Sequence, residues 1–181
     1  PIDAHVILQQ TVELFQQPAA EKAIRLETRL DAQHSVISAD ATRFRQILWN
    51  LIGNAVKFTP LSGLVSIRTS NGVETDSHCL VISVRDTGIG IDPALLPKLF
   101  RAFEQGDLDV TRTFGGLGLG LNISKTLANM HGGQLEAASE GRNCGATFTL
   151  SIPLLLSDDK KSVADDDIEV SSTSTITTTT N

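Results

Sequence analysis

The residues best suited to chemistry begin with two amides and a lysine in the first third of the chain. Asn50, Asn54 and Lys57 recur at intervals that place them on one face of a helix. Amide oxygens suit a hard cation such as Mg²⁺, and a lysine ammonium suits phosphate oxygens. These residue types predict a stripe for a metal ion and phosphate groups, although a merely solvated helix face would have the same pattern.

A second group lies where an apolar strand ends. Asp86 follows Val84 and Arg85, and Gly88 and Gly90 come soon after it. Glycine lets the backbone approach a flat ligand closely, and a partly buried carboxylate needs a hydrogen-bond donor. An exocyclic amine is such a donor. The pattern predicts an edge that binds a flat ligand carrying an amine, and an ordinary glycine turn after a strand is the alternative.

The third group is a run of glycines that leads into a helix. Gly116, Gly118 and Gly120 leave backbone N–H groups free to hold phosphate at the helix N-terminus. The run is not G-x-G-x-x-G, because Leu121 stands where that pattern needs glycine, and it is not a P-loop either. The fourth group, at residues 141–148, fits either a ligand site or a hairpin turn with a bulge.

Helices and strands are expected to alternate in blocks around these groups. Capping residues and glycine or proline stops set the helix bounds, and apolar/polar alternation marks the strands. We expect a polar turn around Asn71-Gly72 and a mobile loop over residues 104–116. The order predicts an α+β fold, a two-layer sandwich of one mixed sheet on about three helices. The expected helices cover residues 3–23 (interrupted at Pro18), 40–58, 93–101 and 117–130, and the expected strands cover residues 24–30, 36–38, 64–70, 79–85, 134–139 and 145–154.

Charge and hydropathy exclude two classes of function. The chain has 181 residues and a net charge of −6, and residues 157–181 carry −4 of it through six acids and two lysines. The other residues, at −2, offer no broad basic field for nucleic acid. No apolar run approaches the roughly 18 residues that cross a bilayer. We therefore expect contact with neither nucleic acid nor membrane.

Two parts are expected, an ordered domain over residues 1–156 and a disordered, acidic, Ser/Thr-rich linker or tail over residues 157–181. Cys79 and Cys144 form no C-x-x-C pair and favour a reduced, cytoplasmic setting. The sequence has no initiator Met and no signal peptide, which indicates a piece excised from a larger protein. That parent protein could itself be anchored in a membrane.

The four groups together, in their order and spacing, resemble the ATP-binding catalytic domain of sensor histidine kinases. This family shares a superfamily, and the two-layer Bergerat ATP-binding fold, with DNA gyrase B, Hsp90 and MutL. The resemblance covers about residues 3–155. The family's motifs correspond to an N box at residues 50–57, a G1 box at 86–90, an F box at 100–103, a G2 box at 116–120 and a last Gly/Thr element at 145–147.

The resemblance implies a role for each residue of these motifs. Asp86 would accept a hydrogen bond from the adenine amino group, and Thr147 would support the same carboxylate or a bridging water. Asn54 would bind Mg²⁺, and Asn50 would assist the ion or a phosphate. Residues 104–116 would form a mobile lid over ATP, anchored by Phe103. Phosphate contacts would come from Asn50, Lys57, Arg112, Gly116, Gly118, Leu119 and Gly120, and the base would lie against Gly88, Gly90, Ile91, Leu121 and Phe148.

The same resemblance implies a protein histidine kinase that uses ATP and Mg²⁺. The γ-phosphate would go to a histidine on a separate dimerisation domain of the same protein, which would form the homodimer. A receiver domain or response regulator would follow, and the acidic tail is typical of the linker in hybrid histidine kinases. No histidine here is followed by an acid, so the acceptor is expected outside this sequence.

Three alternatives remain open at this point. Leu117 stands where the family often has Thr or Ser, and the lost hydroxyl would suit a catalytically degenerate module that binds nucleotide and signals by contact. A serine kinase or an ATPase of the same superfamily is also possible. ATPase relatives have a glutamate base where this chain has Asn50, and an amide cannot take a proton, which favours a kinase.

Overall fold

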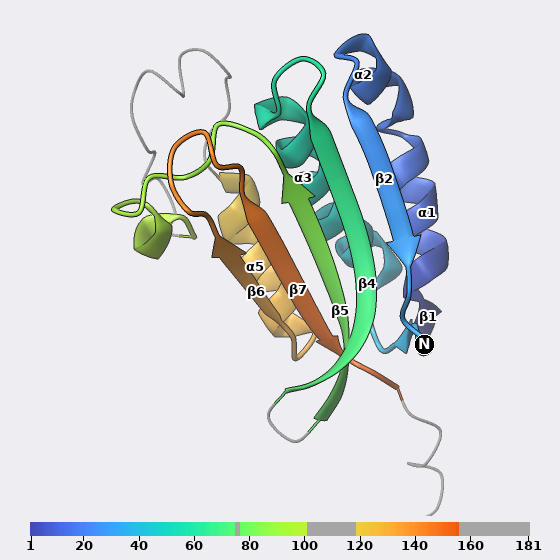
Figure 1. Ribbon diagram of the computed structural model, residues 1–181. Coiled ribbons are helices and arrows are strands. Elements are labelled where there is room, and N and C mark those ends of the chain that lie inside the picture. Colours follow the sequence, from blue (N-terminus) through green and yellow to red (C-terminus); the bar gives the residue numbers. More distant parts are fainter. Residues whose placement is uncertain (75–76, 101–118, 156–181) are drawn as a thin grey trace, which may run out of the picture.

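The computed structural model describes residues 1–74, 77–100 and 119–155. These residues form two layers, a five-stranded sheet and a layer of helices on one of its faces (Figure 1). The helices are α1 (Ala4–Glu13), α2 (Gln16–Glu21), α3 (Ala41–Phe58) and α5 (Leu119–Met130), with a 3-10 turn, η1 (Leu96–Lys98). The strands are β1 (Ile2–Asp3), β2 (Arg25–Leu30), β3 (Val36–Ile37), β4 (Leu64–Glu74), β5 (Ser77–Asp86), β6 (Gln134–Ala138) and β7 (Thr147–Pro153).

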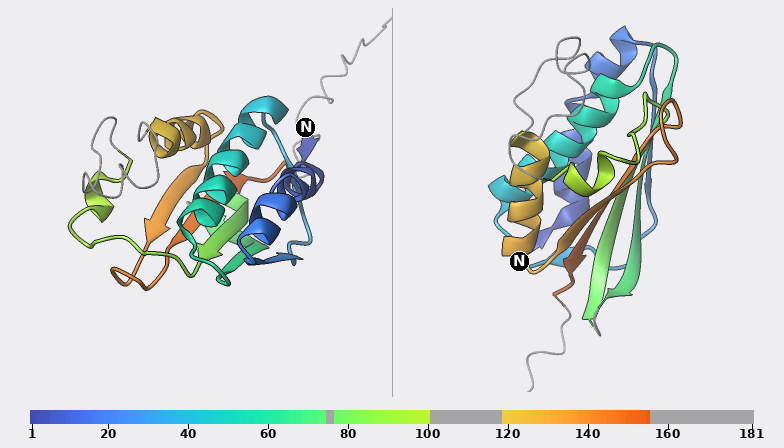
Figure 2. Two further views of the ribbon diagram at one scale, coloured as in Figure 1. Left: turned by 90° about the horizontal axis from the view of Figure 1, so that it is seen from above. Right: turned by 90° about the vertical axis from the view of Figure 1, so that its left-hand side faces the viewer.

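The large sheet is mixed, as predicted. Its strand order is β2-β4-β5-β7-β6, in which β2 and β4 run parallel and every other neighbouring pair is antiparallel. β1 and β3 pair separately as a small two-stranded sheet. The side view in Figure 2 shows the helices on one side of the sheet only. The α+β, two-layer prediction is therefore confirmed.

The helix α3 forms because one capping residue and one apolar face define it. The Asp40 side chain accepts hydrogen bonds from the backbone N–H groups of Thr42 and Arg43, at 2.8 and 2.9 Å. Such an N-cap satisfies donors that the first turn leaves unpaired. The predicted apolar face of this helix is buried completely or almost completely: Phe44, Ile47, Leu48, Leu51, Ile52 and Ala55.

The core fills the space between this helix layer and the sheet. Successive strand residues point to opposite faces, so every second residue of β4, β5 and β7 enters the core. Burying these side chains removes apolar surface from water, which is the main force that holds the two layers together. The buried strand residues include Val65, Ile67, Leu80, Ile82, Val84, Leu135, Phe148, Leu150 and Ile152.

The first predicted helix, over residues 3–23, is two helices. α1 ends at Glu13, and the break falls at Leu14 and Phe15, before the predicted interruption at Pro18. Pro18 instead lies in the first turn of α2, where the missing N–H of proline has no helical partner to lose. The predicted cap at Asp3 is present, because its side chain accepts from His5 N at 2.9 Å.

The predicted polar turn around Asn71-Gly72 is wrong. Both residues lie inside β4, where they pair with Leu80 and Cys79 of β5. The side-chain amide of Asn71 binds the backbone of His34 instead of forming a turn. It donates to His34 O at 2.8 Å and accepts from His34 N at 2.9 Å. The helix predicted over residues 93–101 also differs, since its described part, residues 93–100, contains the 3-10 turn η1 and no α-helix. It contains Pro97, whose missing N–H cannot make the next helical hydrogen bond.

Several predictions lie outside the described residues. They are the loop and lid over residues 104–116 and the disordered tail over residues 157–181, so the division of the chain at residue 156 stays a prediction. Within the described ranges, no helix is both long and apolar enough to span a bilayer.

Candidate functional site

Asp86 ends β5 in a buried position, and one of its two carboxylate oxygens is already occupied. Oδ1 accepts hydrogen bonds from Gly88 N at 2.8 Å and from Ala146 N at 3.3 Å. No described residue donates to Oδ2. Since every fully buried polar side-chain atom in the described ranges has a partner, Oδ2 must be open to solvent. The carboxylate therefore has one fixed oxygen and one that is free to accept from a ligand.

Burial also changes the acidity of this group. Asp86 is 5% exposed, and the desolvation of its charged form raises its pKa above the ordinary value of 3.8. The two backbone hydrogen bonds to Oδ1 oppose this rise and lower the pKa. Desolvation is the larger effect. A buried acceptor of this kind gains most when a ligand brings it a donor.

The glycines around Asp86 are required by close contacts with backbone. A Cβ at Gly88 would lie 2.5 Å from the carbonyl oxygen of Phe58, and a Cβ at Gly145 would lie 2.1 Å from that of Asp86. Gly90 has φ +68° and Gly145 has φ +71°, a region that favours glycine. The predicted glycines thus let two loops and the end of α3 meet around one carboxylate.

Hydrogen bonds join the loop after β5 to the loop between β6 and β7. Gly145 N donates to Gly88 O at 3.1 Å, and Asn143 N donates to Ile89 O at 2.6 Å. The hydroxyl of Ser139 accepts from Ile91 N at 3.0 Å and donates to Gly145 O at 2.7 Å. Ser139 therefore links both loops through a single oxygen.

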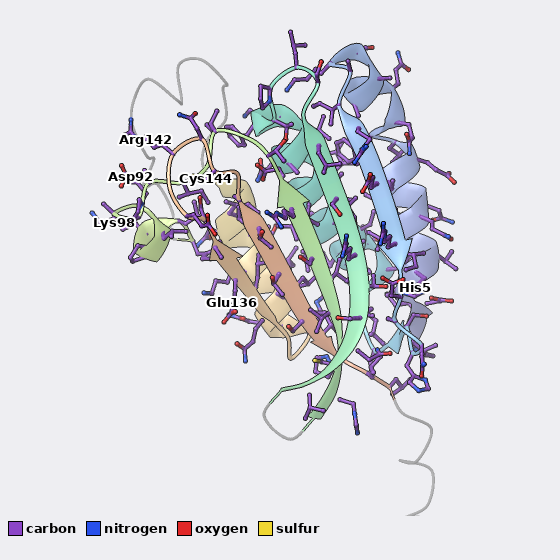
Figure 3. All side chains as sticks on the ribbon, in the orientation of Figure 1. His5, Asp92, Lys98, Glu136, Arg142 and Cys144 are labelled. Atoms are coloured by element: carbon purple, nitrogen blue, oxygen red, sulfur yellow. The ribbon has the colours of Figure 1, made fainter. Side chains whose placement is uncertain are left out.

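An ion pair lies at the outer end of the same two loops. Arg142 Nε is 3.3 Å from Asp92 Oδ2, and both residues are labelled in Figure 3 beside Cys144. The pair is partly exposed, so it contributes little to stability. Its position still holds the tips of the two loops side by side.

The C-terminal turn of α3 reaches this loop cluster. Phe58 O accepts from Ile89 N at 3.3 Å. The last carbonyls of the helix are held from the other side by Lys22, whose ammonium donates to Val56 O at 2.7 Å, to Lys57 O at 3.0 Å and to the carbonyl oxygen of Thr59. Burial lowers the pKa of Lys22. A cation at the C-terminus of a helix is favourable for both hydrogen bonding and the helix dipole.

The predicted amide and lysine stripe lies on the half-buried face of α3. Asn50, Asn54 and Lys57 all have this intermediate exposure. The amide of Asn50 donates to Gly120 O at 3.2 Å and to Ser124 Oγ at 3.1 Å, both on α5. Asn50 thus joins α3 to the start of α5. Asn54 and Lys57 lie one and two turns further along α3.

Thr147 does not contact the carboxylate that it was predicted to support. It pairs with Arg85, and side-chain alternation along β5 and β7 places this pair on the sheet face opposite to Asp86. The second donor to Asp86 is the backbone N–H of Ala146. Phe148 is buried beside Val84 on the core face.

The remaining predicted residues divide into described and undescribed ones. Ile91 and Leu121 are half-buried and pack against the core, and Gly120 lies in the first turn of α5 beside Asn50. Phe100, the first residue of the F box, is fixed to α5 because its carbonyl accepts from Asn122 Nδ2 at 2.7 Å. The predictions for Phe103, Arg112, Gly116 and Gly118 lie outside the described residues, as does the side chain of Leu119.

Three residues of this site were missed by the sequence reasoning: Lys22, Ser139 and Ala146. Lys22 and Ser139 act on backbone groups far away in sequence, and neither a lone lysine nor a lone serine signals such a partner. For Ala146 a signal did exist, because strand alternation after Asp86 and before Phe148 would have placed residue 146 on the carboxylate's face.

The arrangement suits a flat, amine-bearing base followed by phosphates. The free oxygen of Asp86, Oδ2, and the close glycine contacts fit the base, and the half-buried amides of Asn50 and Asn54 fit a hard cation. In the described ranges no three His, Cys, Asp or Glu side chains gather as a metal site. A divalent ion here would therefore depend on amide oxygens and on the ligand's own phosphates.

Comparisons with known proteins agree on one family. The family model described as histidine kinase-, DNA gyrase B-, and HSP90-like ATPase matches residues 39–156. The circadian input-output histidine kinase CikA of Synechococcus elongatus is 38% identical over 84% of this chain and 20% of its own length. The autoinducer 2 sensor kinase/phosphatase LuxQ of Vibrio vulnificus is 41% identical over 80% of this chain and 17% of its own length.

Solved structures show the same likeness. The catalytic domain of histidine kinase ThkA, in a nucleotide-free form, matches with a TM-score of 0.69 and 25% identity over 84% of this chain and 95% of that one. Full-length ShkA in complex with AMPPNP matches with a TM-score of 0.68 and 33% identity over 85% of this chain and 30% of that one. The chain spans about a fifth of the length of the curated relatives it matches. It therefore belongs to the family of histidine kinase-, DNA gyrase B- and HSP90-like ATPases, as an ATP-binding catalytic domain of the sensor histidine kinase type.

Proposed function

We propose that this domain binds Mg-ATP and delivers its γ-phosphoryl group to a histidine on a separate dimerisation domain of the same protein. The observation that carries the proposal is the buried Asp86 carboxylate, which has one oxygen fixed by backbone and the other free. A base with an exocyclic amine satisfies that free oxygen. Membership of the ATP-binding family supports ATP as the nucleotide, and the free oxygen of Asp86 supports recognition of its adenine.

The phosphates would extend from this end of the sheet toward α3 and α5. Asn54 would hold Mg²⁺ through its amide oxygen, and Lys57 would contact phosphate oxygens. Mg²⁺ would neutralise the charge that develops between the β- and γ-phosphates. Asn50 would act mainly by holding the start of α5, where backbone N–H groups would be available to phosphate oxygens.

Phosphoryl transfer needs little covalent help from such a site. The acceptor imidazole has an ordinary pKa of about 6.5 and is largely neutral at physiological pH, so one of its nitrogens can attack the γ-phosphorus directly. The bond from that phosphorus to the bridging oxygen breaks, and ADP leaves. The domain contributes position and charge neutralisation.

The contacts of Asn50 favour a kinase over an ATPase. Hydrolysis needs a base that takes a proton from water, and an amide takes none. The amide nitrogen of Asn50 is moreover engaged with Gly120 and Ser124. The domain alone should bind ATP and hydrolyse it very slowly.

The partners of the site follow from the relatives. CikA, LuxQ and ShkA are longer than this chain, and we infer that a dimerisation domain bearing the acceptor histidine belongs to the parent of this chain too. The phosphoryl group would pass on to a receiver domain or response regulator. Because ATP is the donor, the domain would work in the cytoplasm.

The test is transfer of label from γ-labelled ATP. The parent protein with its own dimerisation domain should gain an acid-labile, alkali-stable label typical of phosphohistidine, while residues 1–181 alone should stay unlabelled. Asn54→Ala should abolish labelling, and Asn129→Ala, on the exposed side of α5, should not. Acid-stable labelling of serine would contradict the proposal. So would release of phosphate by the isolated domain at about 1 per second or faster, near the low end of ordinary enzymes.

A further inference from the structure

The face of the sheet turned away from the helices carries three arginines that have no ion-pair partner among the described residues. Figure 1 views this face from the front, and the described helices all lie behind it. Strand alternation puts Arg29, Arg68 and Arg85 on it, and all three are exposed. Among the described residues none of the three forms an ion pair. We call these three side chains the arginine face.

Two of these arginines lie directly beside one another. Arg29 of β2 and Arg68 of β4 are register partners, so their side chains extend from neighbouring positions on the same face. Like charges at such positions are destabilising. Glu27, which is close by, is already bonded to Arg25 at 2.8 Å. The arrangement therefore has a cost that an anionic partner would remove.

The register partners of Arg68 across the sheet place little negative charge near it. Across the sheet the row continues with Ser83, Thr149 and Glu136. Glu136 is three strands away from Arg68, or roughly 14 Å at about 4.8 Å per strand, which exceeds the Debye length of about 8 to 10 Å. The hydroxyls between them add hydrogen-bond donors for an acidic group.

We propose that the acidic segment of this same chain, residues 158–169, docks on the arginine face. The segment has six acids and two lysines within residues 157–181. The opposite charge favours this segment, and its covalent link to the domain favours it over a free acidic protein, because a short link gives an effective concentration in the millimolar range. The docking adds an electrostatic contact within the chain and is independent of nucleotide binding.

The length of the chain permits this contact. The described residues end at Leu155, whose N–H donates to Val36 O at 2.9 Å. From there to the row of Thr149 and Arg68 is roughly 20 Å along β7 and about 10 Å across two strands, at about 3.3 Å per residue and 4.8 Å per strand. Asp165 is ten residues beyond Leu155, which is up to about 33 Å of extended chain.

A spin label tests the proposal in the full chain of 181 residues. Cys144 is exposed and Cys79 is buried, so Ser171→Cys in a Cys144→Ser background gives one reactive thiol next to the acidic segment. The label should broaden the backbone amide resonances of Arg68 and Ser83 at low salt. The broadening should disappear at 0.5 M salt, where the Debye length falls to about 4 Å.

Charge variants decide whether the arginines are responsible. Arg68→Gln with Arg85→Gln should abolish the broadening, whereas Arg43→Gln with Arg45→Gln, on the exposed side of α3, should preserve it. Neutralising Asp165, Asp166 and Asp167 to Asn should also abolish it without touching the folded domain. Broadening that survives both the arginine and the aspartate changes would overturn the proposal. Broadening spread equally over helices and strands would also overturn it. So would an added acidic peptide that binds the arginine face of the full chain without competition from the chain's own acidic segment.

Discussion

The two halves of the proposed nucleotide site are built in different ways. On the base side, Asp86, Gly88 and Gly145 are fixed by backbone hydrogen bonds and by contacts that leave no room for a Cβ. On the phosphate side, Asn54 and Lys57 are half-buried side chains on the surface of α3. The base side is preorganised by the fold, and the phosphate side depends on side chains that the ligand completes.

This difference predicts that a change on the phosphate side stops the chemistry while sparing recognition of the base. Asn54→Ala should lower the rate of phosphotransfer by about 100-fold or more, as expected when one contact to developing charge is lost. Adenosine affinity should change by less than about threefold, a difference below roughly 0.7 kcal/mol. Single-turnover labelling and adenosine titration measure the two separately. An equal loss in both would mean that the halves are not independent.

A change on the base side should instead be felt as lost stability. Gly145→Ala forces a Cβ toward Asp86 O at 2.1 Å and keeps φ near +71°, so unfolding free energy should fall by about 3 kcal/mol. Gly132→Ala is the matched control, because Gly132 has φ +69° but its nearest atom, Pro153 Cγ, would be 3.6 Å away. There the loss should be about 1 kcal/mol.

Urea unfolding of both glycine variants gives the comparison directly. Equal losses at Gly145 and Gly132 would show that the left-handed backbone, and not the close approach of the two loops, dominates. That result would remove the steric part of the preorganisation argument.

Ser139→Ala should have a smaller effect on the base side. The hydroxyl accepts a hydrogen bond from Ile91 N and donates one to Gly145 O. Removing it leaves these two groups without this partner and should lower the free energy of unfolding by about 1 to 2 kcal/mol. Ser70→Ala, on the exposed face of β4, should cost almost nothing. We expect ADP affinity to fall severalfold in Ser139→Ala alone. Unchanged affinity together with unchanged hydrogen exchange at Ile91 would contradict the linking role.

The raised pKa of Asp86 predicts opposite pH dependences for binding and stability. Only the ionised carboxylate accepts fully from an amine, so ADP affinity should fall as the pH drops through this raised pKa, at a higher pH than for an ordinary aspartate. The folded state holds the Asp86 proton more tightly than the unfolded chain does. Its contribution to stability is therefore complete below about pH 3.8 and is lost as the pH rises through the folded pKa.

The variant Asp86→Asn isolates that contribution. Asp3 and Asp40 have lowered pKa values, through a hydrogen bond from Ser35 in the first case and from Arg43 N in the second, and their stabilisation is lost as the pH falls. Subtracting the stability of Asp86→Asn from that of the wild type at each pH removes these shared effects. The free energy of unfolding of the wild type should fall relative to that of the variant as the pH rises toward neutrality. A constant difference would contradict the desolvation of Asp86.

The sequence predicted the parts of this site that repeat or cap. The helical spacing of Asn50, Asn54 and Lys57 placed them on one face of α3, and the Asp40 cap set where that helix begins. The two-layer mixed sheet followed from the order of the blocks. These features are local, so a single stretch of sequence contains the information.

The sequence could not predict contacts between distant backbone groups. Lys22 reaches the carbonyls of α3 from the helix pair before it, and Ser139 joins two loops. The error at Asn71 had the same cause, because the residue looked like a turn while its amide was committed to His34. Thr147 was chosen by resemblance, and only the register of β5 and β7 shows that it lies on the opposite face from Asp86.

The most direct test of the base side is the discrimination between ADP and GDP. Guanine presents a carbonyl oxygen where adenine presents its amine, so a free Asp86 oxygen should repel it. Isothermal titration of the wild type should show ADP bound about 100-fold or more tightly than GDP. Asp86→Asn should abolish the preference while the protein stays folded. A preference for ADP that survives this substitution would contradict the account.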